Sequence, residues 1–120
     1  MAHALGFIVA YDRRLAARLR EMFADCPSVR EKPMFGALAF LVADRMAVAA
    51  MPDGGLLVRV EITRAEDLVR TTAAQPAKMR GRTMRGWVHI GSEHVRSRRR
   101  LGEWIAIGTA AATSALDATT

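Results

Sequence analysis

The chain has 120 residues, of which 51% are hydrophobic and 25% charged, and its formal net charge is +6. These are ordinary values for a soluble globular domain, and the length suffices to bury a core without disulfide or metal staples. The single cysteine, Cys26, excludes an internal disulfide and a thiolate-rich zinc site, so a reducing, cytoplasmic setting is expected.

The first nine residues contain an apolar run with no basic region before it. This run is too short to span a membrane and resembles a signal sequence poorly, so no membrane association is predicted. We expect residues 1–9 to form a disordered extension, residues 10–112 to form the folded domain, and residues 113–120 to form a flexible tail.

The first predicted helix runs from Arg13 to Ala24. Asp12 is a suitable N-cap for it, because a carboxylate there can accept a hydrogen bond from a free backbone amide. Pro27 follows the helix and cannot continue its hydrogen bonding. The apolar residues that recur on one face at helical spacing are Leu15, Leu19, Met22 and Phe23.

Four strand-like segments follow, separated by turn residues, and together they predict an antiparallel meander. Pro33 favours an edge position or a bulge, and Gly36 permits a turn that a Cβ would hinder. Asp44-Arg45 supplies a tight turn, and Pro52-Asp53-Gly54-Gly55 gives the strongest turn signal in the chain. The predicted strands are residues 29–35, 38–43, 46–51 and 56–60.

A second helix is predicted after the meander. Thr63 and Glu66 have the spacing of a capping box, in which each side chain satisfies a backbone amide near the other residue. The helix would continue through Arg70. Residues 71–82 are predicted to be an irregular connection.

The last predicted strand covers residues 84–90, with Trp87 facing the core. A final helix follows and carries Leu101 and Trp104 on its inner side. Gly102 and Gly108 should weaken that helix by about 1 kcal/mol each relative to Ala.

The predicted fold class is α+β, with two layers and the element order α-β-β-β-β-α-β-α. Helices pack on one face of an antiparallel sheet of about five strands. Arg59 should point outward by strand alternation, or pair with Glu31 or Glu61 if it is buried. Apolar residues at strand spacing usually face a core rather than a ligand pocket, and the residues so interpreted are Met34, Phe35, Leu38, Phe40 and Met46.

Basic residues concentrate in one part of the chain, since residues 78–100 carry a net charge of +7 and the remainder −1. The arginine cluster falls at the start of the final helix, where the helix dipole is already positive and amides could join guanidiniums around a phosphate. A solvated charged loop is the simpler interpretation, and contact with an acidic protein partner is a third. The cluster consists of Arg96, Arg98, Arg99 and Arg100, and the basic residues that could join it are Lys78, Arg80, Arg82 and Arg85.

Other reactive residues give weaker signals. His89 and His94, with Glu93, are too few for a complete metal site, so neither a metal nor a cofactor is expected. Asp25 beside Cys26 disfavours a thiolate, so we interpret this cysteine as a small, partly buried residue at a helix end. The sequence contains no catalytic constellation.

Two blocks of sequence are similar to the signature of a known family, the TfoX N-terminal domain. The blocks are residues 31–40, Glu-Lys-Pro-Met-Phe-Gly-Ala-Leu-Ala-Phe, and residues 79–87, Met-Arg-Gly-Arg-Thr-Met-Arg-Gly-Trp. The resemblance extends over about residues 10–112. The signature positions, interpreted as mainly structural, are Glu31, Lys32, Met34, Phe35, Gly36, Leu38, Phe40, Arg59, Gly81, Met84, Gly86 and Trp87.

The resemblance implies a two-layer fold similar to that of small secretion-chaperone-like domains. The best-known members of the family regulate natural competence together with other transcription factors, and they carry a second, C-terminal domain. This chain resembles the stand-alone members, and the family offers no catalytic residue to transfer. Because family members usually begin at the equivalent of Ala10, Val9 is an alternative initiator, which mass spectrometry of the native N-terminus would test.

The leading functional hypothesis is a cytoplasmic, non-enzymatic regulatory or interaction domain with protein partners linked to transcription. The alternative is direct binding of a nucleic acid or phosphate ligand through the arginine cluster. An enzyme with an unrecognised site is a third hypothesis, and the sequence leaves open a homodimer formed through the sheet edges.

Overall fold

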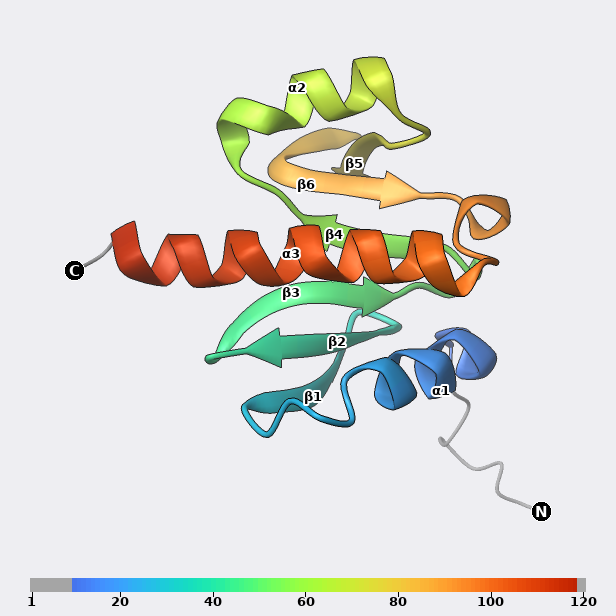
Figure 1. The fold of residues 1–120 in the computed structure, drawn as a ribbon. Coiled ribbons are helices and arrows are strands. Elements are labelled where there is room, and N and C mark those ends of the chain that lie inside the picture. The colour runs from blue at the N-terminus through green and yellow to red at the C-terminus, as the bar shows by residue number, and fades with distance from the viewer. Residues whose placement is uncertain (1–9, 119–120) are drawn as a thin grey trace.

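A six-stranded antiparallel sheet, covered on one face by three α-helices, forms the framework of residues 10–118, the part of the chain that the computed structural model describes (Figure 1). The strand order is β1-β2-β3-β4-β6-β5. The predicted α+β class, two layers and antiparallel sheet are therefore confirmed. The elements are α1 (Arg13–Met22), β1 (Val29–Met34), β2 (Ala37–Val42), β3 (Arg45–Ala50), β4 (Leu56–Arg59), α2 (Ile62–Thr71), β5 (Gln75–Met79), β6 (Arg82–Ile90), the 3₁₀ turn η2 (Ser92–His94) and α3 (Arg98–Ala118).

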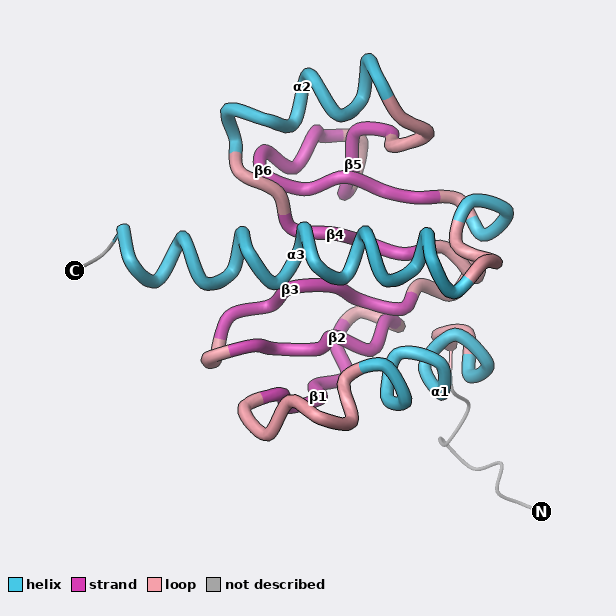
Figure 2. The backbone as a smooth tube through the Cα atoms, viewed as in Figure 1, coloured by secondary structure: helices cyan, strands magenta, loops and turns pink. Residues whose placement is uncertain are grey.

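Three of the strand connections are two-residue turns, which keep neighbouring strands in register (Figure 2). Phe35-Gly36 joins β1 to β2, Ala43-Asp44 joins β2 to β3, and Arg80-Gly81 joins β5 to β6. All six residues have positive φ, as two-residue turns of type I′ require. The turn role predicted for Gly36 is confirmed, whereas the second turn is centred one residue earlier than the predicted Asp44-Arg45.

The sheet has six strands rather than about five, because β5 lies in the segment that we predicted to be an irregular connection. It pairs with β6, which also begins two residues earlier than predicted. The two edge strands, β1 and β5, each contain a proline, Pro33 and Pro76. Since proline lacks an amide hydrogen, both edges are poor templates for an added strand.

The main core lies between the sheet and the helices. Phe40 in β2 is 1% exposed and its ring stacks on Phe23 after α1, with the ring centroids 5.6 Å apart. Leu101 and Trp104 bring α3 against the middle of the sheet, so the core position predicted for Trp104 is confirmed. Val58 of β4 and Val88 of β6 complete the layer beneath.

Several predicted core residues lie elsewhere. Phe35 is in a turn and is 85% exposed, so its assignment to the core is wrong. Met34 and Met46 belong to a second, smaller apolar cluster on the other face of the sheet. Trp87 is half-buried beside Arg59, its register partner, rather than in the core. For the residues in strands the cause is alternation: side chains of successive residues point to opposite faces, and Val88 and Leu38 are among those that face the main core.

The helix ends differ from prediction in several places. Helix α1 ends at Met22, two residues before the predicted Ala24. Helix α2 begins at Ile62, and its N-cap is Glu61, without a side-chain hydrogen bond, so the predicted capping box of Thr63 and Glu66 is wrong. Helix α3 continues to Ala118. The flexibility of residues 113–120 stays a prediction, and residues 1–9 lie outside the described part of the chain. None of the helices in residues 10–118 has the length and apolar character to cross a membrane.

The predicted N-cap of α1 is confirmed, since the Leu15 amide donates a 2.8 Å hydrogen bond to Asp12 Oδ1. We expect Asp12→Ala to lower the free energy of unfolding by about 0.5–2 kcal/mol, because this amide would lose its partner. Urea unfolding followed by circular dichroism measures the change. Thr63→Ala is the matched control and should change the stability little; equal losses in both variants would contradict the cap assignment.

Candidate functional site

The arginine cluster lies where α3 begins, and the local sequence explains that start. Ser97 caps the helix, because its hydroxyl accepts a 3.0 Å hydrogen bond from the Arg100 amide and its carbonyl accepts one from the Leu101 amide. Consequently Arg98, Arg99 and Arg100 occupy the first turn, which contains no acidic residue. Three cations there oppose the helix dipole and favour a nearby anion.

Two of the arginines already have acidic partners. Arg98 Nη1 lies 3.0 Å from Glu21 Oε1 of α1, and Arg99 Nε lies 3.5 Å from Glu103 Oε2 one turn along α3. These pairs are exposed to solvent and contribute little to stability. Their carboxylates nevertheless neutralise two of the four arginines that the sequence predicts as ligand contacts.

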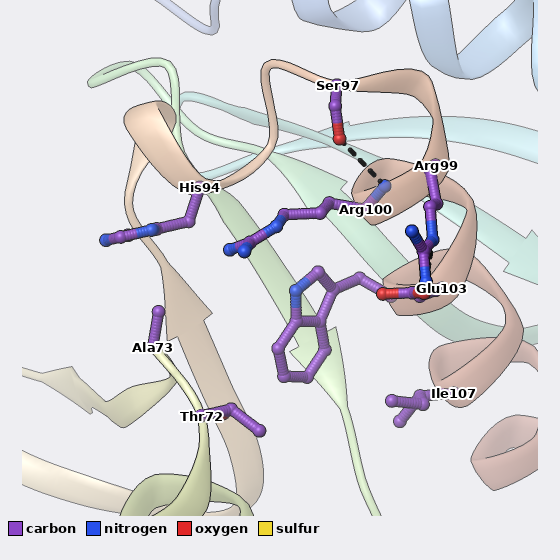
Figure 3. A pocket seen from close by; sticks show the side chains of 9 residues that line it. Thr72, Ala73, His94, Ser97, Arg99, Arg100, Glu103 and Ile107 are labelled. Atoms are coloured by element: carbon purple, nitrogen blue, oxygen red, sulfur yellow. Dashed lines mark hydrogen bonds and ion pairs between the residues drawn. The ribbon is translucent and has the colours of Figure 1, made fainter.

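The remaining two arginines form no ion pair with a carboxylate of residues 10–114. The Arg96 carbonyl accepts a 2.9 Å hydrogen bond from Arg18, which fixes the backbone before α3. Arg100 extends over a cavity of about 630 Å³ (Figure 3). Arg100 is therefore the member of the cluster best placed to meet a ligand.

This cavity lies between the start of α3, the turn η2 and the loop before β5 (Figure 3). Arg100, Ser97 and His94 offer hydrogen-bond donors to it, and Trp104 contributes an apolar wall. Glu103 also lines the cavity, but its carboxylate is paired with Arg99, whose side chain points toward Glu103 in Figure 3. The site could hold one phosphate group or a similar anion. Its lining residues are Thr72, Ala73, His94, Ser97, Arg99, Arg100, Glu103, Trp104 and Ile107.

The structure does not bring the other predicted basic residues to this cavity. Arg82 and Arg85 are exposed near the beginning of β6, whereas η2 and α3 follow its other end. Arg85 lines a different cavity, together with Ala111 in the second half of α3. Lys78 and Arg80 belong to the hairpin of β5 and β6. A single basic surface joining all eight residues is therefore not formed.

The histidines are also separated. His89 Nε2 lies 3.1 Å from Asp53 Oδ2, and the second oxygen of this carboxylate accepts a hydrogen bond from the Gly55 amide. His94 Nε2 is 3.9 Å from Glu93 Oε2 and faces the cavity beside α3. Within residues 10–118, no group of three or more His, Cys, Asp or Glu side chains could hold a metal ion.

Among the signature residues, Glu31 and Arg59 have clear structural roles. Glu31 accepts two hydrogen bonds from Arg20, at 2.7 and 2.9 Å, which join β1 to α1 and raise the pKa of Arg20. Arg59 donates a 2.6 Å hydrogen bond to the Met46 carbonyl and lies 4.6 Å from the Trp87 ring centroid. Burial, with a smaller effect of nearby Arg45, lowers the pKa of Arg59. Arg59 thus needs neither of the carboxylates that we considered.

The sheet also has a smaller apolar cluster on the face opposite the helices, which was not predicted from the sequence. Its small floor consists of Ala37, Ala39 and Ala49, which are all buried. The signal was present in β2, whose residues are apolar without interruption, because such a run indicates a strand with apolar contacts on both faces. The larger side chains packed around the floor are Met34, Leu41, Met46, Met51 and Leu57.

A family model described as the TfoX N-terminal domain matches residues 21–112. This range contains both signature blocks, all six strands and the start of α3. No curated protein matches the chain.

Proposed function

Because the chain belongs to the TfoX N-terminal domain family, we propose that it is a non-enzymatic regulatory domain that acts through contacts with proteins of the transcription machinery. The match over residues 21–112 carries this proposal. It is supported by the resemblance to competence regulators, which work together with other transcription factors. The smaller apolar cluster on the other face of the sheet, which no helix of residues 10–118 covers, suits a domain that binds other proteins.

The test is to delete the gene in the organism that encodes the chain and to measure the transcripts. We expect a defined set of genes to change expression and to recover when the wild-type chain is restored. A native pull-down with the tagged chain should recover a transcription-associated protein. Unchanged transcripts together with no such partner would contradict the proposal.

A second candidate function is binding of a nucleic acid or phosphate ligand at the start of α3. The observation that favours it is the placement of Arg100 over the cavity, with Ser97 and His94 beside it and without a carboxylate partner in residues 10–114. Arg96 is exposed just before the helix and could add a second contact. The site would recognise phosphate groups rather than base sequence.

We expect fluorescence anisotropy to detect binding of the chain to mixed-sequence DNA and RNA, with affinity that falls as salt rises. If Arg96 and Arg100 make the contacts, the logarithm of the DNA association constant should fall with the logarithm of salt with a slope of roughly −2. The double variant Arg96→Ala/Arg100→Ala should lose this binding, whereas the matched variant Arg82→Ala/Arg85→Ala should retain it. No binding by the folded wild type would leave the cluster as solvated charge.

A further inference from the structure

We call the sheet face opposite the helices the open face. It carries an apolar strip, which consists of Met34, Ala37, Ala39, Leu41, Met46, Ala49, Met51 and Leu57. Ala39 of β2 pairs with Ala49 of β3, and Ala49 pairs with Leu57 of β4, so these side chains share one face. Ala39 and Ala49 are fully buried beneath larger neighbours, whereas Leu41 and Met46 are half-buried. The strip is therefore an apolar surface of buried alanines surrounded by larger side chains that remain partly accessible to solvent.

The strip leads into a hollow at the side of the sheet formed by β5 and β6. A cavity of about 620 Å³ lies there, and Met51 and Leu57 belong to both the strip and the cavity. Ala77 and Pro76 extend the apolar lining onto β5. A partner could therefore place a large apolar side chain in the hollow, as anchor residues do at protein interfaces.

The charged residues around the strip are predominantly basic. Lys32 of β1 is the register partner of Ala39, Arg59 stacks on Trp87, and Lys78 lines the hollow. None of these three forms an ion pair with a carboxylate within residues 10–114. Two acidic residues nearby have partners: Asp44 pairs with Arg30 at 3.2 Å, and Asp53 Oδ2 lies within hydrogen-bond distance of His89 Nε2, at 3.1 Å.

This charge decides between the occupants that the face could accept. A second copy laid face to face would bring basic residues against basic residues, which is unfavourable. Pairing along the sheet edges is opposed by Pro33 and Pro76. A partner segment with an apolar face and acidic flanks could instead pack on the strip and pair with the basic residues around it.

The size of the strip matches a helix. From β1 to β4 the strip crosses three strand spacings, or roughly 15 Å, which is about the length of three turns of α-helix. Methionine side chains, as at Met34, Met46 and Met51, adapt readily to the shape of a partner. We propose that the open face binds an acidic, amphipathic α-helix of a partner protein, with Lys32, Arg59 and Lys78 contacting its carboxylates. This inference rests on the proposed function insofar as that function requires a protein partner.

The test uses two synthetic helical peptides of about three to four turns with the same leucine face, one with glutamates and the other with lysines on the remaining positions. Each is titrated into the ¹⁵N-labelled full chain, and amide shifts are followed by NMR. We expect the glutamate peptide to shift amides around the strip and the hollow, with weaker binding at high salt, and the lysine peptide to bind far less. Shifts confined to the helix-covered face, no binding, or equal binding of both peptides would overturn the proposal.

A pair of charge reversals locates the contact. Lys32→Glu should weaken binding of the glutamate peptide about fivefold at low salt, as expected for loss of an exposed ion pair. Arg64→Glu, the same kind of change on exposed α2, should leave it unchanged. Both residues are exposed, so both variants should fold, which circular dichroism checks. Equal effects of the two reversals would overturn the proposal.

This result is independent of the transcript experiment. Peptide binding at the open face, with unchanged transcripts and no transcription-associated protein in the pull-down, would contradict the proposed function alone. A transcript response that persists in a chain whose open face binds no glutamate peptide would sink this inference alone.

Discussion

Phe40→Ala is expected to lower the free energy of unfolding by about 3–5 kcal/mol. The side chain is 1% exposed and lies at the centre of the main core, where its ring stacks on Phe23. Alanine would remove most of the buried surface and leave a cavity that the rigid sheet cannot fully close. Chemical denaturation followed by tryptophan fluorescence or circular dichroism measures the loss.

Phe35 supplies the matched control, because it lies five residues away in the same signature block but is 85% exposed. Phe35→Ala should change the free energy of unfolding by less than about 0.5 kcal/mol. A similar loss in both variants would mean that Phe35 packs against the domain, contrary to the structure. A small effect of Phe40→Ala would contradict the described core.

Gly108→Ala is expected to destabilise the protein by about 2–3 kcal/mol, even though alanine is the better helix former. A Cβ on Gly108 would lie 2.5 Å from the Ala47 carbonyl oxygen and 2.9 Å from Val48 Cγ1. Both neighbours belong to β3 in the middle of the sheet, so α3 would have to move away from strands that it covers. Thermal and urea unfolding of the variant measure the cost.

Gly102 lies in the same helix and gives the opposite expectation. A Cβ there would meet only Met22 Cε, at 3.2 Å, and the flexible end of that methionine can shift. Gly102→Ala should therefore stabilise the protein by up to about 1 kcal/mol, the difference in helix propensity. If both variants gained stability, the close approach of α3 to β3 would be refuted.

The parts of the fold that sequence could predict are those that local chemistry determines. Asp12 caps α1 and the Pro52–Gly55 segment ends a strand, because both act on their immediate neighbours. β5 could not be predicted, since Gln-Pro-Ala-Lys-Met has no strand preference of its own. It is a strand because the Arg80-Gly81 turn folds it against β6.

The candidate site shows the same division. The position of the arginine cluster at a helix start followed from the sequence, since Ser97 and the apolar residues after it signal that start. The acidic partners of the cluster could not be predicted from the sequence, because Glu21 is 77 residues away from Arg98 and contacts it only in the folded chain. Likewise Trp87 and Val88 are both apolar, and only the register with β4 shows which one faces the core.

The arrangement of α3 has a consequence for how the protein is made. This helix follows all six strands in the chain, yet it covers β3 and β4 in the middle of the sheet. A nascent chain that has emerged from the ribosome only as far as β6 would therefore expose Val48, Val58 and their neighbours to water. We expect such a chain to be retained by chaperones and to complete its folding only after α3 has been synthesised.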